Sequence, residues 1–168
     1  MELLDIYDAA RQRTGRSIAR DGEVLPGEHL LVVHVCVVNK QGEMLIQRRQ
    51  STKDRYPGCW DLSAGGFVRS GEETAEAALR ELEEELGLRL APEDLRFLFT
   101  EPFSYVLDDY YLARCDAALS ALSLQPEEVS EAKWASRAEV EEMICDGRFV
   151  DYPLDGIRRV FRLASELL

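Results

Sequence analysis

Four glutamates crowd into five residues near the middle of the chain, in the stretch "RELEEELGL" from Arg80 to Leu88. Carboxylates three or four positions apart on a helix repel each other. With about 100° between successive residues, Glu81, Glu84 and Glu85 fall within one arc, beside the leucines that anchor the helix. Such a set suits a hard divalent cation such as Mg²⁺, which prefers carboxylate oxygens and commonly bridges to substrate phosphates. The cluster therefore predicts a preformed metal site, with Arg80 pairing with Glu84 or an upstream glutamate to fix the charges.

The spacing around this cluster is that of a known signature. From Gly66 the chain reads "GFVRSGEETAEAALRELEEELGL", which matches every position of G-x5-E-x7-R-E-U-x-E-E-x-G-U, where U is apolar. Its fixed positions are Gly66, Glu72, Arg80, Glu81, Glu84, Glu85 and Gly87. A chance match is expected in roughly one chain in a million at ordinary residue frequencies. Because this pattern is the signature of the Nudix hydrolases, the chain resembles that family.

The resemblance implies an enzyme. Nudix enzymes hydrolyse a nucleoside diphosphate linked to another group, or a similar small diphosphate compound, with Mg²⁺ or Mn²⁺ as cofactor. By the same resemblance, Glu84 and Glu85 are the direct metal ligands, and Glu81 is a further ligand or the base that activates water. Arg80 orients these glutamates. Water attack on phosphorus needs a deprotonated water and neutralised phosphate oxygens, and clustered Mg²⁺ can meet both needs.

Residues beside the glutamates also have roles that the resemblance implies. Gly66 lets the backbone come close to the metal, and its carbonyl is a candidate ligand, while Glu72 supports the loop and helix geometry. In this family the general base can come from a later loop. Here the candidates are Glu101, Asp108 and Asp109, and the alternative for each is an ordinary surface acid.

A local positive patch precedes the signature. The segment "IQRRQSTKDRYPGCW" holds Arg48, Arg49, Lys53 and Arg55, and one or two of these are candidates to bind substrate phosphates. The alternative is exposed charge on an edge strand and loop. Trp60 is a candidate to stack on a base or a prenyl group, and its alternative is packing in the core.

The same segment resembles a second group of Nudix proteins. "NKQGEMLIQRR" followed by "YPGCWDLSAGG" is similar to the proteins related to isopentenyl diphosphate isomerase. Those isomerases need a cysteine and a histidine at positions that are Gly65 and Phe67 in this chain. The chain thus resembles this subgroup in scaffold and the hydrolases in chemistry. An isomerase-type enzyme and a Nudix module that binds a nucleotide without turnover remain the alternatives, although the three intact glutamates weigh against mere binding.

The elements that must position these residues are strands and amphipathic helices. Residues 29–39 form a β-branched run typical of a central strand, with 43–50 as its partner. The signature helix spans 72–86, with Ser70 or Gly71 as its cap and Gly87 as its stop. Other predicted elements are a strand at 2–8, a short hairpin within 13–28, strands at 95–106 and 109–117 joined by a turn at 107–109, a strand segment at 128–136, and helices at 137–147 and 155–168. These predict an α/β protein, a Nudix-type α/β/α sandwich with a mixed sheet between helices.

Composition bounds the remaining possibilities. The 168 residues contain no repeat or linker and predict a single domain over 1–168. A net charge of −12 argues against binding long nucleic acid. No apolar run approaches the roughly 20 residues of a membrane span, and the N-terminus lacks a secretory signal, so we expect a cytoplasmic protein. The four cysteines lack zinc-ligand spacing and are expected to be buried or partly buried thiols. The last amphipathic helices can serve a homodimer or only the core.

Overall fold

A seven-stranded mixed sheet forms the middle of the molecule in the computed structural model, which describes residues 2–167. Its strands are β3 (Leu30–Val38), β4 (Met44–Arg49), β5 (Trp60–Asp61), β6 (Ala64–Phe67), β7 (Leu95–Phe103), β8 (Val106–Arg114) and β9 (Val129–Ala135). The order is β5-β4-β3-β8-β7, with β6 paired to β3 and β9 paired to β4. β3 runs parallel to β8 and antiparallel to β6, so the sheet is mixed, as predicted.

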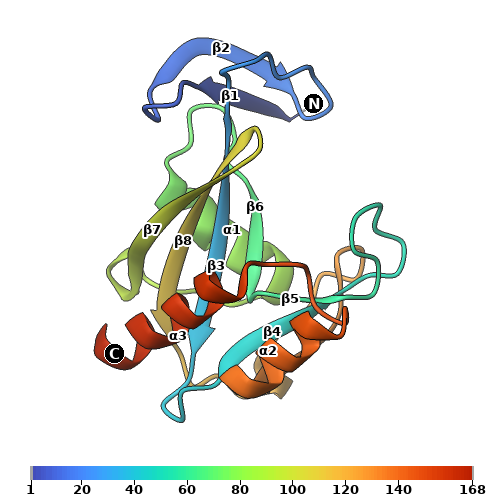
Figure 1. Ribbon diagram of the computed structural model, residues 1–168. Coiled ribbons are helices and arrows are strands. Elements are labelled where there is room, and N and C mark those ends of the chain that lie inside the picture. The colour runs from blue at the N-terminus through green and yellow to red at the C-terminus, as the bar shows by residue number, and fades with distance from the viewer. Residues whose placement is uncertain (1, 168) are drawn as a thin grey trace.

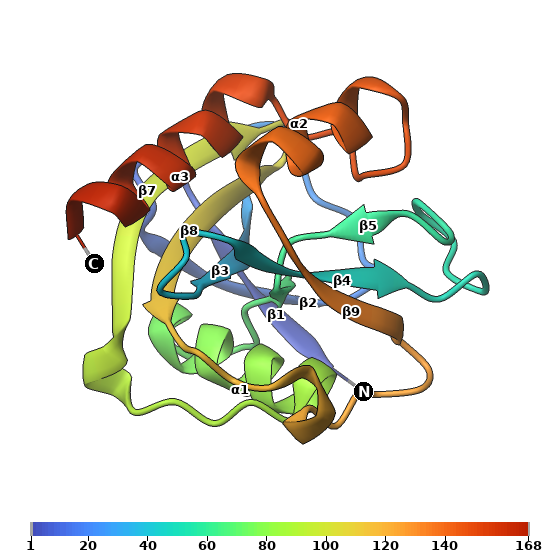
Figure 2. The same ribbon diagram turned by 90° about the horizontal axis from the view of Figure 1, so that it is seen from below.

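Helices cover both faces of this sheet (Figures 1 and 2). Helix α1 (Thr74–Leu86) lies on one face, and α2 (Arg137–Cys145) and α3 (Leu154–Leu167) lie on the other. β3 supplies both cores because its side chains alternate: Val33 and Val35 pack in the cluster with α1, and Cys36 packs in the cluster with α2 and α3. Two short 3-10 helices, η1 (Pro92–Asp94) and η2 (Leu119–Ala121), complete the elements. The predicted α/β/α sandwich is confirmed.

An N-terminal hairpin forms a separate sheet at one end of the central one (Figure 1). β1 (Leu3–Tyr7) pairs antiparallel with β2 (Arg13–Ala19), so the hairpin predicted inside residues 13–28 is wrong. The physical reason is burial, because Ile18 pairs with Leu4 and both pack on Leu30 in a small core cluster. Phe67 packs against that cluster and so joins the hairpin to the end of β6.

The turn predicted at 107–109 lies instead between β7 and β8, at Ser104 and Tyr105, where Ser104 has a φ of 56°. Leu107 and Asp109 are buried within β8, where they pair with the central strand β3. Adjacent acids suggested a turn, but Asp109 has a buried place because Arg11 pairs with its carboxylate. The burial of Asp109 beside Arg11 thus places this residue inside β8 instead of in a turn.

The start of α1 also differs from the prediction. Glu73 is the N-cap, and its N–H donates to the carboxylate of Glu76 at 2.9 Å. Ser70 does not cap the helix, since its hydroxyl donates to Asp5 at 2.6 Å. Gly87 ends the helix in the left-handed conformation, with a φ of 65°, as predicted.

β4 is less of a partner to β3 than predicted. Only Val38 and Met44 pair between them, and β4 then pairs along its length with β9. All four cysteines are free, as expected, but Cys145 is exposed instead of buried or partly buried. Within residues 2–167, no helix is long and apolar enough to cross a membrane.

Candidate active site

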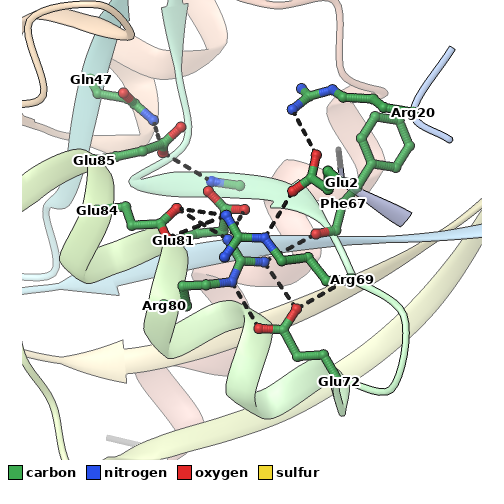
Figure 3. A network of polar contacts seen from close by, with 11 residues as sticks. Glu2, Arg20, Gln47, Phe67, Arg69, Glu72, Arg80, Glu81, Glu84 and Glu85 are labelled. Carbon is green, nitrogen blue, oxygen red and sulfur yellow. Dashed lines mark hydrogen bonds and ion pairs between the residues drawn. The ribbon is translucent and has the colours of Figure 1, made fainter. Parts of the chain in front are cut away.

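Arg80 is the centre of a polar network between the end of β6 and helix α1 (Figure 3). Its Nε and Nη2 donate to the two carboxylate oxygens of Glu72 at 2.8 and 3.0 Å. Its Nη1 donates to Glu81 at 2.6 Å and to Glu84 at 3.2 Å. Nη2 also donates to the backbone carbonyl of Phe67 at 3.1 Å. Although burial opposes the shift, the bonds to Glu72 and Glu81 raise the pKa of Arg80, so one permanent cation ties the loop to the helix.

Arg80 cannot be replaced by lysine without loss, because an ammonium group lacks the planar fork that reaches several acceptors. For Arg80→Lys we expect kcat/KM to fall about 30-fold, since Glu72 and Glu81 lose their common partner. Steady-state kinetics beside thermal unfolding would check this result. Arg89→Lys is the matched control, because Arg89 pairs with Glu83 at the exposed end of the helix. Equal activity in both variants would contradict the role of Arg80.

Glu85 is the buried member of the acidic set, with 8% of its surface exposed. One oxygen, Oε2, accepts a hydrogen bond from Gln47 Nε2 at 2.7 Å and from the Gly65 N–H at 3.2 Å. Burial, followed by the proximity of Glu81, raises the pKa of Glu85 to about 8. Burial also raises the pKa of Glu81. A cation that binds Glu85 at neutral pH therefore has to displace a proton.

The raised pKa of Glu85 predicts a pH-dependent stability. Its folded-state value of about 8 exceeds the ordinary value of 4.5, so the folded protein holds this proton more tightly than the unfolded chain. The resulting stabilisation is complete below about pH 4.5 and is lost as the pH rises through about 8. We expect the wild type to lose on the order of 3 kcal/mol more stability over this range than Glu85→Gln does. Urea unfolding in EDTA would measure this difference, and parallel pH profiles would contradict it.

Glu84 is the outermost carboxylate, with 41% of its side chain exposed. It accepts hydrogen bonds from Arg80 and, at 3.3 and 3.4 Å, from Arg69 Nη2. Glu81 and Glu84 thus share Arg80 as a donor, whereas Glu85 is turned toward Gln47 and Gly65. Within the described part of the chain, no three acidic, histidine or cysteine side chains lie so that they could hold a metal ion. The metal site therefore stays a prediction.

The chemistry of the set nevertheless suits a divalent cation. Glu81, Glu84 and Glu85 are oxygen donors on neighbouring turns of α1, and glutamate side chains can rotate toward a shared ion. Gly66 lies against them, because a Cβ added there would come within 2.2 Å of Glu81 Oε1. A side chain at this position would therefore displace the Glu81 carboxylate. These four residues remain the predicted metal ligands.

The predicted phosphate-binding cations are held by other groups. Arg48 donates to a backbone carbonyl at 2.9 Å, Arg49 Nη1 donates to Asp61 at 3.1 Å, and Lys53 pairs with Glu128. Asp61 is close enough to Glu85 to contribute to its raised pKa. Arg49 is therefore joined to the neighbourhood of the glutamates through Asp61. Phosphate binding by these three cations stays a prediction.

Trp60 does not present a free ring for stacking. It is 9% exposed and packs in the core on the side of α2 and α3. Lys133 Nζ lies 4.8 Å from the ring centroid. Hydrophobic burial therefore decides its place, and the alternative given for Trp60, packing in the core, is confirmed.

The three candidate bases have different surroundings. Asp109 is fully buried and paired with Arg11, so its prediction as a base for water is wrong. Asp108 lies 3.2 Å from His34 Nε2 and is partly exposed. Glu101 pairs with Asp108 across β7 and β8. Asp108 and Glu101 remain candidates.

Several polar residues near the site had no signal in the motif. Gln47 holds Glu85, and Arg69 occupies a variable position of the signature yet reaches Glu84. Tyr152 donates to Asp61 at 2.7 Å and lies 3.3 Å from His34 Nδ1. A polar residue inside the apolar run of β4 was the one hint for Gln47. The other contacts join residues far apart in sequence.

Comparison with known proteins identifies a family and similar folds. A family model described as the NUDIX domain matches residues 28–152. An uncharacterised Nudix hydrolase of Listeria monocytogenes is 40% identical over 152 residues, which are 90% of each chain. Another from Pseudomonas aeruginosa is 47% identical over 102 residues, 60% of this chain and 59% of that protein. A crystal structure of a Deinococcus radiodurans protein superposes with a TM-score of 0.80 at 28% identity, covering 95% of this chain and 99% of the other.

Proposed function

This chain belongs to the NUDIX family and is a hydrolase, and from that premise we propose that it cleaves a diphosphate linkage by attack of water on phosphorus. The substrate we propose is a small nucleoside diphosphate-type or related molecule. One observation carries the proposal: Arg80 gathers Glu72, Glu81 and Glu84 at the loop where Gly65 also meets Glu85.

We propose Mg²⁺ or Mn²⁺ as the cofactor. When bound, such an ion neutralises charge on the phosphate oxygens and lowers the pKa of a water ligand. The carboxylates of Glu81, Glu84 and Glu85 and the carbonyl of Gly66 would hold it. Arg80 keeps Glu81 and Glu84 side by side, and Gln47 orients Glu85.

The remaining roles are binding of the substrate's phosphates and acceptance of a proton from water. Arg48, Arg49 and Lys53 are proposed to contact the substrate's phosphates once they leave their present partners. Asp108, beside His34, is proposed to receive a proton from water, with Glu101 as the second candidate. The net charge of −12 supports a small anionic substrate in preference to long nucleic acid. A cytoplasmic location and a homodimer are also proposals.

The isomerase alternative has specific observations against it. The isomerase cysteine would stand at Gly65, where an added Cβ would lie 2.8 Å from the Val33 carbonyl. The isomerase histidine would stand at Phe67, whose side chain packs against the N-terminal hairpin. The resemblance to the isomerase-related subgroup is thus a resemblance of scaffold. A Nudix module that only binds its ligand is the remaining alternative.

One assay separates these possibilities. The protein is incubated with nucleoside triphosphates, nucleotide sugars, dinucleotides and isopentenyl diphosphate, with Mg²⁺, with Mn²⁺ and with EDTA. Products are resolved by chromatography. We expect phosphate-bearing products from one compound class, with EDTA abolishing their formation. Isomerised isopentenyl diphosphate, or tight binding without products, would overturn the proposal.

A further inference from the structure

The N-terminal hairpin lies outside residues 28–152, which match the family model. It is hydrogen-bonded to the loop before α1, at variable positions of the signature. The Ser70 N–H donates to the Leu3 carbonyl at 2.7 Å. The carboxylate of Asp5 accepts from the Ser70 hydroxyl at 2.6 Å and from the Gly71 N–H at 2.9 Å. The hairpin therefore fixes the backbone on either side of Ser70, next to Arg69.

Arg69 connects this hairpin to the acidic set (Figure 3). Its Nε donates to Glu2 at 2.8 Å, and its Nη2 donates to the carboxylate of Glu84 at 3.3 and 3.4 Å. Glu2 is also paired with Arg20 at 3.2 Å. The shorter bond is thus the one to Glu2, and the longer contact is the one to Glu84.

These contacts place the positive charge of Arg69 between two carboxylates, Glu2 and Glu84. Glu84 is the most exposed of the predicted ligands, and Arg69 is a counterion on it that a divalent cation must compete with. Glu2 draws the same guanidinium the other way and neutralises part of its charge. We propose that Arg69 is a positioning residue, tethered by Glu2, that sets the affinity of Glu84 for the divalent cation. This inference rests on the proposed function.

Removing Arg69 and removing the charge of Glu2 should change the affinity for Mn²⁺ in opposite directions. Arg69→Ala removes a competing positive charge, so we expect the Kd for Mn²⁺ to fall about five-fold. Glu2→Gln frees the guanidinium to pair fully with Glu84, so we expect the Kd to rise about three-fold. If Arg69 were only a brace for the loop, its removal would weaken metal binding.

The test is a titration of the full chain with Mn²⁺ alone, followed by electron paramagnetic resonance and calorimetry. Arg16→Ala is the matched control, because Arg16 lies on the same hairpin but pairs with Glu28. Its Kd should equal that of the wild type. The double variant Glu2→Gln/Arg69→Ala should match Arg69→Ala, because Glu2 acts through Arg69. Thermal unfolding without metal would report whether each variant remains folded.

The outcomes separate the role of Arg69 from the existence of the metal site. Tighter binding by Arg69→Ala together with weaker binding by Glu2→Gln supports the proposal. Unchanged or weaker binding by a folded Arg69→Ala overturns it while leaving the metal site in place. A wild type that binds no Mn²⁺ overturns the metal site in the proposed function, and this inference with it.

Discussion

Glu85→Gln is expected to lower kcat/KM by about 1,000-fold on the substrate that the assay identifies. Glu85 is the buried ligand candidate, and an amide oxygen cannot replace a carboxylate that gives up its proton to bind a cation. The surrounding fold should persist, because Gln47 and Gly65 can still donate to the amide oxygen. Steady-state kinetics with Mg²⁺ and with Mn²⁺ would measure the loss.

The neighbouring glutamate provides the control for this experiment. Glu83 lies on the same helix but pairs with Arg89 away from the acidic set. Glu83→Gln should therefore keep its activity within about two-fold of the wild type, as surface changes usually do. Full activity in Glu85→Gln would mean that the metal site has been assigned to the wrong face of α1.

Gly66→Ala is expected to lower kcat/KM by about 100-fold and stability by about 2 kcal/mol. The added methyl group would lie 2.2 Å from Glu81 Oε1, so either the carboxylate or the backbone must move. Because Arg80 also holds Glu81, the displacement would pass to Glu72 and Glu84. Kinetics and urea unfolding of the same preparation would record both effects.

Gly42→Ala separates loss of stability from loss of the site. Gly42 has a φ of 79° and nothing within 4 Å of an added Cβ. We expect it to lose about 1 kcal/mol through backbone strain while keeping its activity. An active Gly66→Ala would show that Glu81 can leave this position without consequence.

The sequence predicted the parts of the fold that local spacing determines. The leucine stripe and Gly87 predicted α1 and its end, and the β-branched run predicted β3. The signature also identified the residues that Arg80 gathers. Local spacing carries this information because helical and strand periodicity decide which side chains share a face.

What the sequence did not predict depends on distant contacts. The conformation of the carboxylates depends on Gln47 and Arg69, and neither is a fixed position of the signature. For Trp60 the sequence left both stacking and core packing open, because its burial depends on the helices that follow it. Asp109 resembled a turn residue until Arg11, far away in sequence, supplied its counterion. Pairing across the chain, rather than residue type, decided each of these.

The segment that matches the family is shorter than the packed core of this protein. The family model ends at residue 152, before α3. Yet Ile157, Val160 and Phe161 of α3 are buried in the core beside α2. A fragment trimmed to the family boundaries would leave the part of the sheet that α3 covers exposed, and it would also lose the contact of Arg69 with Glu2. For recombinant work, the useful unit therefore includes both flanking segments.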